Sequence, residues 1–193
     1  MRNQLRPAIL LTVVLCLVTG IAYPAVVTAV AQLLFPRQAN GSVVERNGRP
    51  VGSELIAQAF IRPEYFHPRP SAAGTGYDAT ASAGTNKGPT DLKLADTLIA
   101  ASVAEARKEE GVRGSLPSDM VTRSASGLDP HISPANAELQ IRRVALARGV
   151  DGSRIRDLVA RHTEGRQFGL FGDPRVNVLM LNLDLDATAP MHE

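Results

Sequence analysis

Apolar residues are distributed along this chain in two different ways. An uncharged run of thirty residues extends from Pro7 to Pro36, which exceeds the roughly 20 apolar residues needed to cross a bilayer core. After Arg37 the apolar groups become short and are separated by Gly, Pro and polar residues. The pattern therefore predicts three parts: an N-terminal segment over residues 1–6, a transmembrane helix over residues 7–36 and one domain over residues 37–193.

The charges beside the run predict its orientation. Arg2 and Arg6 precede it, whereas only Arg37 follows it before a neutral stretch that reaches Glu45. Positive charge flanking a membrane span favours the cytoplasmic side. We therefore expect a single-pass protein of the cell (inner) membrane with its N-terminus in the cytoplasm and its domain extracytoplasmic.

A cleaved signal peptide is the alternative interpretation of the same run. Ala29, Val30 and Ala31 resemble a cleavage site. The apolar core of a signal peptide is roughly 7–15 residues long, but 22 uncharged residues, from Pro7 to Thr28, precede Ala29. We favour a retained anchor, and both interpretations place the domain in the same compartment.

Pro24 lies inside the predicted span. It has no N–H to donate to the carbonyl of Gly20, and its ring crowds that carbonyl, so a kink is expected there. Gly20, Ala22 and Ala25 have small side chains that permit close helix packing. Either the proline is incidental in a lipid-exposed anchor, or the helix is shaped to pack against partner helices.

The region after Arg37 begins with turn and loop signals. Asn47-Gly48 between two short β-favouring runs predicts a hairpin. Ser53 to Phe60 fits a short helix or a strand. Residues 71–90 predict an extended loop, and a loop of that length in a compact domain is functional, partner-bound or disordered.

Three helices and one strand are predicted farther along. The first helix covers Thr90 to Glu110 and ends before Gly111. The second begins at Ser133-Pro134 and ends at Gly149, and the third begins at Asp151 and ends near Gly165. The inward face of the first helix is expected to hold five apolar residues: Leu92, Ala95, Leu98, Ile99 and Val103.

The segment from Arg175 to Asp186 alternates over most of its length and predicts a strand. The fold class expected from all of these elements is α+β. It consists of one N-terminal transmembrane helix and a single domain with about three helices and a small antiparallel or mixed sheet.

Composition and charge exclude several classes of protein, partner and site. Hydrophobic residues make up 44% and charged residues 21% of the chain, which excludes a disordered chain. The pI near 9.0 suggests a basic protein, but the net charge of +2 is accounted for by Arg2 and Arg6. The neutral remainder argues against a nucleic-acid partner. Cys16 is the only cysteine, so there is neither an internal disulfide nor a cysteine zinc site.

The chain lacks the motifs of a pump or a channel. GTNKGPT does not have the spacing of a phosphate loop. No DKTGT-like phosphorylation segment and no TVGYG-like filter are present. One span cannot enclose a pore, so the chain alone neither hydrolyses ATP nor conducts ions. We expect no metal site and no cofactor on it.

The densest polar cluster is the loop from Ser124 to Pro134, which includes Ser126, Asp129 and His131. It has three interpretations: a rigid loop that caps turns, a partner-contact loop, or the Ser–His–Asp site of a membrane-tethered extracytoplasmic hydrolase. A triad normally gathers residues from separated elements, and a metal site needs one more ligand. We favour the rigid loop.

Three polar residues of the second predicted helix are expected to lie at its surface or at an interface. Gln140 is interpreted as a solvated or interface glutamine. Arg142 and Arg143 are interpreted as part of a solvated helix face.

Eight segments of the chain, taken in order, resemble the KdpC family, the C subunits of the Kdp potassium-transporting P-type ATPase. The resemblance covers nearly the whole chain, and its departures are small: Ala57, Asp78 and Arg123 stand where Gly, Asn and Ala are usual. The matching segments are RPA at 6–8, TGIAYP at 19–24, FPRQANGS at 35–42, GSELIAQAF at 52–60, YFHPRPSA at 65–72, SAGTNKGPT at 82–90, SGLDPHISPANAELQIRRVALAR at 126–148 and GDPRVNVLMLNLDLD at 172–186.

The resemblance implies a non-catalytic accessory subunit of a high-affinity, ATP-driven potassium uptake complex. Its partners would be a channel-like subunit that selects potassium and a P-type ATPase subunit, and these would handle potassium and ATP. The family is described as needed for assembly or stability and as a catalytic chaperone that raises the ATP affinity of the ATPase subunit. Partner packing in the membrane would use Gly20, Tyr23 and Pro24, and the candidate partner-contact loop holds Ser126, Asp129 and His131.

The resemblance also assigns a nucleotide-linked role to Gln140, which corresponds to a glutamine held to contact ATP. This assignment conflicts with the predicted topology, since an extracytoplasmic domain meets no ATP. We give the topology more weight, and an indirect effect on the pump remains compatible with it.

Overall fold

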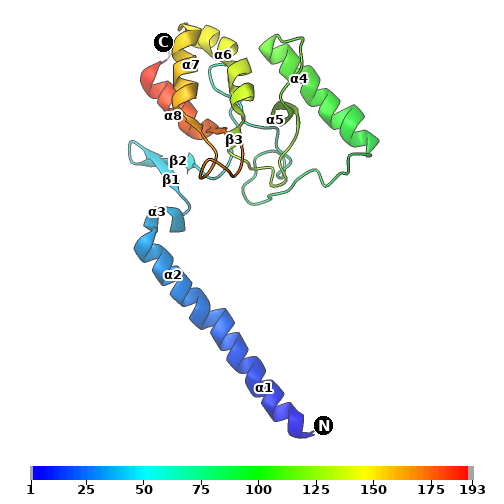
Figure 1. Cartoon of the computed structure of the whole chain (residues 1–193), viewed down its shortest axis with the longest axis vertical. Helices are drawn as coiled ribbons and strands as arrows, with labels where there is room; N and C mark the ends of the chain where they lie inside the picture. The colour runs from blue at the N-terminus through cyan, green and yellow to red at the C-terminus, as the bar shows by residue number, and fades with distance from the viewer. Residues whose placement is uncertain (1, 191–193) are drawn as a thin grey trace. The chain divides into compact units, whose positions relative to one another are not determined.

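The computed structural model describes residues 2–190, and describes side chains for residues 4–190. The chain consists of two compact units, residues 1–51 and residues 52–193. Figure 1 follows the chain from the long N-terminal helix to the C-terminal helix.

The first unit is dominated by one long apolar helix. Its parts are α1 (Arg2–Leu17), a π-helical turn η1 (Val18–Ala22) and α2 (Tyr23–Leu34). From Gln4 to Leu34 the helix has 31 residues, and its most apolar stretch has a mean hydropathy of 2.4 with no buried residue. By length and composition this helix can cross a membrane.

The irregularity expected at Pro24 takes the form of a π-helical turn. The N–H of Tyr23 donates to the carbonyl of Val18, five residues earlier. One extra residue in the turn makes room for the proline ring and accommodates its missing donor. The Thr19 hydroxyl adds a bond to the carbonyl of Leu15 at 2.7 Å.

A short helix and a hairpin complete the first unit. Helix α3 (Pro36–Ala39) precedes β1 (Val43–Arg46) and β2 (Arg49–Ser53), which form a two-stranded sheet. Asn47 and Gly48 have φ of 55° and 73°, as the tight hairpin turn requires. The hairpin predicted from Asn47-Gly48 is therefore confirmed.

The second unit combines helices with a small antiparallel sheet. Its sheet has the strand order β3-β5-β4, with Ile132 opposite Val176 and Val176 opposite Thr163. The elements in chain order are η2 (Lys93–Ile99), α4 (Ala100–Glu110), α5 (Ser118–Val121), β3 (His131–Ile132), α6 (Pro134–Arg148), α7 (Gly152–Arg161), β4 (Thr163–Glu164), β5 (Arg175–Asn177) and α8 (Val178–Thr188).

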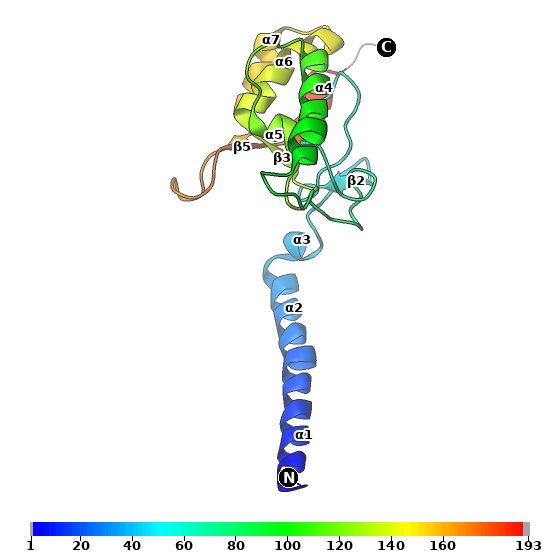
Figure 2. The ribbon, with the colours of Figure 1, turned by 90° about the vertical axis from the view of Figure 1, so that its right-hand side faces the viewer.

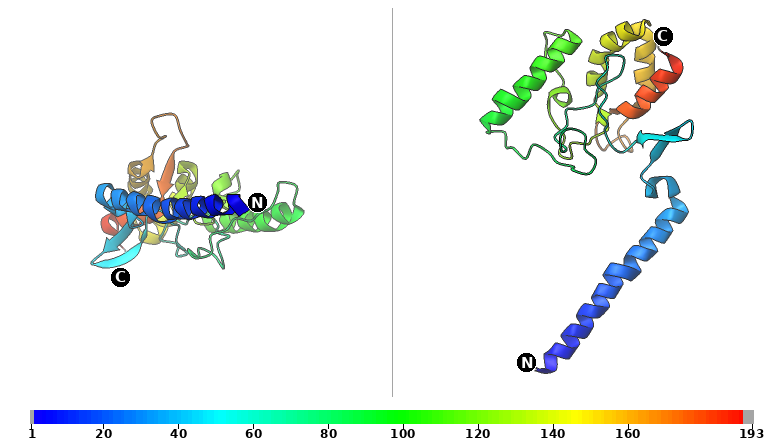
Figure 3. Two further views of the ribbon diagram at one scale, coloured as in Figure 1. Left: turned by 90° about the horizontal axis from the view of Figure 1, so that it is seen from below. Right: turned by 180° about the vertical axis from the view of Figure 1, so that it is seen from behind.

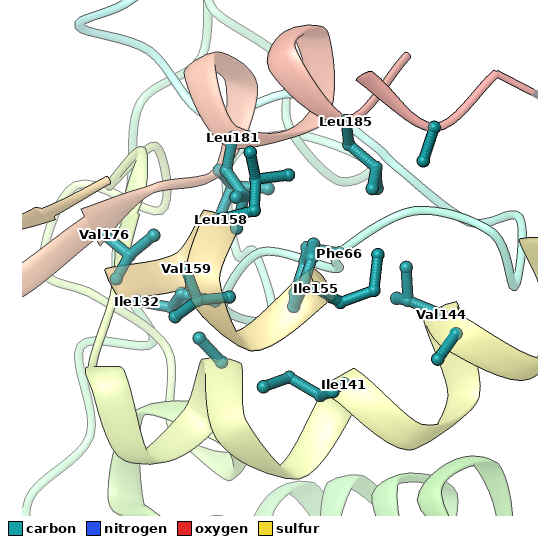
Figure 4. Packing of buried hydrophobic residues seen from close by; sticks show 14 residues of the cluster. Phe66, Ile132, Ile141, Val144, Ile155, Leu158, Val159, Val176, Leu181 and Leu185 are labelled. Carbon is teal, nitrogen blue, oxygen red and sulfur yellow. The ribbon is translucent and has the colours of Figure 1, made fainter. Parts of the chain in front are cut away.

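The main core lies between α6, α7, α8 and the sheet. Phe66, from an irregular segment, is completely buried at its centre, and Ile155 and Leu181 face it from α7 and α8 (Figure 4). Burying one such side chain contributes about 1.5–3 kcal/mol. The core therefore fixes the 60–70 segment against the three helices.

A second, smaller core lies where α4 and α5 meet α6. Its buried members are Ala106, Met120 and Val121. Helix α6 packs against α7 on one side and α4 on the other, and the front and back views show it between them (Figures 1 and 3). Residues on α6 thus reach both cores.

The strand predicted for Arg175 to Asp186 is wrong in most of its length. Only Arg175–Asn177 is a strand, and α8 follows directly. The Asn177 side chain accepts a hydrogen bond from the N–H of Met180 at 3.1 Å and so starts the helix. In a strand the leucines at 179, 181, 183 and 185 would share one face. The residues that α8 buries include Val178, Leu181, Asn182 and Leu185, which follow the spacing of a helix.

Two other expectations need correction. The third helix ends at Arg161 rather than near Gly165, because Thr163 and Glu164 form β4. In the first helix Ile99 and Val103 pack against a core as expected, but Leu92 is 75% exposed. The fully buried positions of α4 are Ser102, Ala106 and Glu110. The domain also has more helices than the three expected.

Residues 71–90 contain no helix or strand but are tied to the 124–128 loop. The Ser71 hydroxyl donates to the carbonyl of Gly127 at 2.6 Å, and the Ser82 hydroxyl donates to the carbonyl of Ser126 at 2.9 Å. The long loop therefore has a defined path over a second loop.

Candidate functional site

The polar loop singled out from the sequence is held firmly by its surroundings. Leu128 and Pro130 are buried, and the carbonyl of Leu128 accepts from the N–H of Ala57 at 3.0 Å. Gly127 has φ of 68°, and a Cβ on it would lie 2.5 Å from the carbonyl oxygen of Ala83. The loop is rigid because two other segments pack directly on its backbone.

Asp129 is the charged centre of this loop. Its carboxylate accepts from Arg69 Nη1 at 3.0 Å and from the backbone N–H of His131 at 3.0 Å. Partial burial alone raises the pKa of Asp129, but the hydrogen bonds from His131 and the charge of Arg69 outweigh it and hold that pKa below its ordinary value. Asp129 is therefore a carboxylate that organises the loop.

The loop does not form a hydrolytic triad. The hydroxyls of Ser124 and Ser126 lie 3.3 Å from each other, and Ser133 donates to Asp119 at 2.9 Å. Within residues 4–190 no serine hydroxyl hydrogen-bonds to His131, so the nucleophile–base contact of such a site is missing. The same residues contain no group of three or more His, Cys, Asp or Glu side chains able to hold a metal.

Gln140 is buried, which corrects its interpretation as a solvated glutamine. It is 2% exposed. Its oxygen accepts from the N–H of His67 at 2.7 Å and from Arg143 Nη2 at 2.7 Å. Its nitrogen donates to the carbonyl of His67 at 3.1 Å and to the side chain of Asn136 at 2.8 Å. All four hydrogen-bonding positions of the amide are filled within the domain.

Asn182 on α8 makes the matching contact with the preceding residue. Its side chain bonds both the N–H and the carbonyl of Phe66, each at 2.9 Å. Gln140 and Asn182 thus bond the backbone N–H and carbonyl of two consecutive residues of an extended segment, His67 and Phe66. A neighbouring β-strand would bond the same backbone groups. Sequence reasoning missed Asn182 because the alternating pattern placed it in a strand.

Arg143 is also not part of a solvated face. Its side chain is 10% exposed and lies 2.9 Å from Glu110 Oε1. The same guanidinium donates to the carbonyls of Pro63 and Tyr65 at 2.7 and 2.8 Å. Arg142 is exposed, as expected.

Arg148 is a further buried arginine that sequence reasoning did not single out. Its side chain has 0% exposure and pairs with Asp186 Oδ1 at 2.8 Å. It donates to the carbonyl of Glu64 at 2.8 Å and lies 5.0 Å from the centroid of the Tyr65 ring. The signal was its spacing: Arg148 is eight residues after Gln140, on the same buried face of α6.

Glu110, the last residue of α4, is the buried acidic partner of Arg143. Its side chain is 3% exposed, and its Oε2 has no hydrogen-bond partner among residues 4–190. Burial raises the pKa of Glu110 above its ordinary value, although Arg143 opposes the shift. Glu110 is therefore a desolvated carboxyl, and it lines the cavity described next.

A cavity of about 310 Å³ lies between α4 and the 60–70 segment, and Gln140 lines it. Three further lining residues are the carboxyls Glu105, Glu109 and Glu110. Carboxylates repel a triphosphate. The chemistry of the cavity does not favour ATP.

The residues expected to pack against partners in the membrane lie together on the long helix. A Cβ added to Gly20 would meet no atom within 4 Å, and Tyr23 is 66% exposed. Pro24 begins the first turn of α2. Among the described residues, this part of the helix therefore leaves space beside Gly20 and an exposed Tyr23.

Comparisons with known proteins give one consistent result. Residues 5–187 match the family model described as KdpC: K+-transporting ATPase, c chain. The Potassium-transporting ATPase KdpC subunit of Gemmatimonas aurantiaca is 59% identical over 194 residues, which cover 98% of this chain and 97% of the relative. The KdpC subunits of Rhodospirillum rubrum and Koribacter versatilis are 53% and 52% identical, and each alignment covers 98% or more of both chains. The chain therefore belongs to the KdpC family of potassium-transporting ATPase subunits.

Proposed function

We propose that this KdpC-family chain is the non-catalytic subunit that assembles and stabilises an ATP-driven potassium uptake complex. Its partners are a channel-like potassium-selecting subunit and a P-type ATPase subunit, which handle potassium and ATP. The observation that carries the proposal is the 31-residue apolar helix with no buried residue in its most apolar stretch. Such a surface is stable only in lipid or against other membrane helices.

The proposed topology places the N-terminus in the cytoplasm and the domain outside. The charge distribution beside the helix supports it. A cysteine introduced as Ser153→Cys in a Cys16→Ser background tests it, because Ser153 is exposed on α7. We expect a membrane-impermeant thiol reagent to label intact cells. Labelling only after lysis would place the domain in the cytoplasm and contradict the proposal.

Two surfaces of the chain are proposed to contact partners. In the membrane the contact uses the vacant helix surface at Gly20, Tyr23 and Pro24, where small residues let helices approach closely. Outside the membrane it uses the rigid loop with Ser126, Asp129 and His131, whose ordered backbone would lose little entropy on binding.

We propose that the chaperone effect on ATP affinity is indirect. A subunit that binds one pump conformation better than another shifts the population toward it, and ATP affinity follows the population. Gln140 contributes by holding the 60–70 segment in place, since its amide is already fully bonded within the domain.

The direct test of assembly is a pull-down of the tagged chain in mild detergent. We expect the wild-type chain to recover a multi-span channel-like protein and a P-type ATPase in stoichiometric amounts. Gly20→Leu should reduce that recovery, because its side chain fills the vacant surface, whereas Gly20→Ala should change it less. Equal recovery with Gly20→Leu would remove this helix surface from the proposal.

A further inference from the structure

The connection between β4 and β5 displays three large apolar side chains to solvent. Phe168, Leu170 and Phe171 are 92%, 74% and 66% exposed, and we call them the apolar tip. Two views show this connection projecting beyond the helices of its unit (Figures 2 and 3). Three such side chains fall within four consecutive residues, unlike the singly exposed leucines of an ordinary surface.

The backbone under the tip has a fixed shape. Gln167 and Phe171 exchange two backbone hydrogen bonds, at 2.9 and 3.0 Å. Phe168 has φ of 53°, in the left-handed region that bulky residues rarely adopt, and Gly169 follows with φ of 73°. The turn holds Phe168 in this strained conformation, with the side chains of the apolar tip exposed. A contact made by a fixed turn costs little ordering entropy.

The charges at the base of the tip neutralise one another. Arg166 pairs with Asp173 at 3.2 Å, and Arg175 pairs with Glu164 at 2.9 Å. No unpaired cation therefore flanks the tip within residues 164–175. Loops that bind anionic membranes combine apolar side chains with free Lys or Arg. The charge balance favours an uncharged apolar protein pocket over a lipid surface.

The size of the tip bears on which protein it binds. Each aromatic side chain buries about 150–250 Å², so the tip supplies roughly 500 Å² of its own surface, below the roughly 800 Å² that each partner contributes to a standard interface. A second copy of the chain would not be held by so small a contact. A partner that already holds the membrane helix needs only a small added contact, because the tether raises the effective concentration.

We infer that the apolar tip is an anchor that inserts into an apolar, uncharged pocket on the extracytoplasmic surface of a partner subunit of the same ATPase. The inference rests on the proposed function and adds to it a surface that neither the membrane helix nor the Ser126–His131 loop supplies. The two aromatic side chains have the character of interface hot spots.

A photo-crosslinking residue in place of Phe168, in the full chain expressed with its partners, tests the inference. We expect one adduct with a multi-span subunit of the complex. An adduct with lipid alone, or with a second copy of this chain, would overturn the inference and identify that occupant instead.

A triple variant supplies the energetic test. Phe168→Asn keeps a residue that tolerates the left-handed conformation, and Leu170→Ser and Phe171→Ser remove the other apolar groups. We expect recovery of the partner subunits to fall at least about tenfold, the effect of losing one hot-spot residue. The control is Leu146→Ser, on α6, because Leu146 is 72% exposed and outside the tip.

The outcomes separate this inference from the proposed function. Thermal unfolding of each full-length variant in detergent should match the wild type, since the tip is exposed. If the wild-type chain recovers the partner subunits and the triple variant recovers them equally, the tip inference alone fails. If the wild-type chain recovers no partner, the proposed function itself fails.

Discussion

The carboxamides of Gln140 and Asn182 each use one donor and one acceptor to pair with a single residue of an extended segment. The segment itself has no strand neighbour, so its buried polar groups depend on these side chains. Arg143 and Arg148 bind further carbonyls of the same segment. At the scale of single residues, the domain is organised by polar side chains that replace a sheet ladder.

Replacing Gln140 with methionine tests this role. Gln140→Met keeps a similar volume but removes the partners of the partly buried N–H and carbonyl of His67. We expect a loss of about 2–4 kcal/mol in the free energy of unfolding, measured by chemical denaturation followed by circular dichroism. The control, Glu138→Ala, changes a residue of the same helix and removes its largely exposed ion pair with Arg156 of α7. It should cost at most about 1 kcal/mol.

The opposite result has a definite meaning. Unchanged stability of Gln140→Met, together with weaker ATP binding by the assembled complex, would support a nucleotide contact for Gln140 and contradict the structural role.

Glu110 predicts a pH dependence of stability. Burial raises its pKa in the folded chain above the ordinary 4.5, so between the two values the folded chain holds a proton that the unfolded chain has lost. Stability from this group is present below pH 4.5 and is lost as the pH rises through the folded pKa. The stability of the wild type relative to Glu110→Gln should therefore fall as the pH rises.

Asp129 supplies the contrast for this measurement. Its pKa is lowered in the folded chain, so the stability of the wild type relative to Asp129→Asn should rise with pH up to about the ordinary value of 3.8. Denaturation curves at a series of pH values measure both differences. If the stability of the wild type relative to Glu110→Gln rose with pH instead, the charge of Arg143, and not burial, would dominate the pKa of Glu110.

At the scale of elements, two irregular loops depend on close backbone contact. A Cβ on Gly127 would meet Ala83 at 2.5 Å and Ala73 at 2.7 Å, whereas a Cβ on Gly149 would meet no atom within 4 Å. Both glycines have left-handed backbones, with φ of 68° and 65°. The two positions therefore separate the cost of conformation from the cost of contact.

We expect Gly127→Ala to reduce the free energy of unfolding by about 1–3 kcal/mol more than Gly149→Ala, which pays only the conformational cost. Limited proteolysis should show faster cleavage within residues 71–90 in the Gly127 variant alone. Equal losses of stability in both variants would mean that the two loops do not pack as described.

Elements also show where sequence patterns succeed and where they fail. Asn47-Gly48 predicted its hairpin, and Ser133-Pro134 predicted the start of α6, because turn and cap chemistry is local. The segment after Asn177 was assigned wrongly because its apolar residues fit both the alternation of a strand and the spacing of a helix. The packing of α7 against α8 decides between them.

At the scale of the whole molecule, both apolar cores lie after Gly52. Their members run from Phe60 to Ala189, and the three-stranded sheet lies inside the same unit. A unit that contains its own core and its own sheet can fold alone.

We therefore expect a fragment of residues 52–193 to unfold cooperatively, with a midpoint within about 5 °C of the full chain in detergent. The fragment should recover less of the partner subunits than the full chain, because it lacks the membrane helix. Aggregation of the fragment, or a gradual unfolding curve, would show that the second unit depends on the first.

The membrane helix, its flanking charges, the turns and the helix caps could be recognised along the chain, since each depends on residues that are neighbours in sequence. The KdpC-like segments could be recognised for the same reason. The burial of Gln140, Arg143 and Arg148 could not, because a polar residue on a helix has no buried character until a distant segment supplies its hydrogen-bond partners. Contacts between residues more than 70 positions apart, such as His67 with Gln140, decide which polar groups hold the domain together.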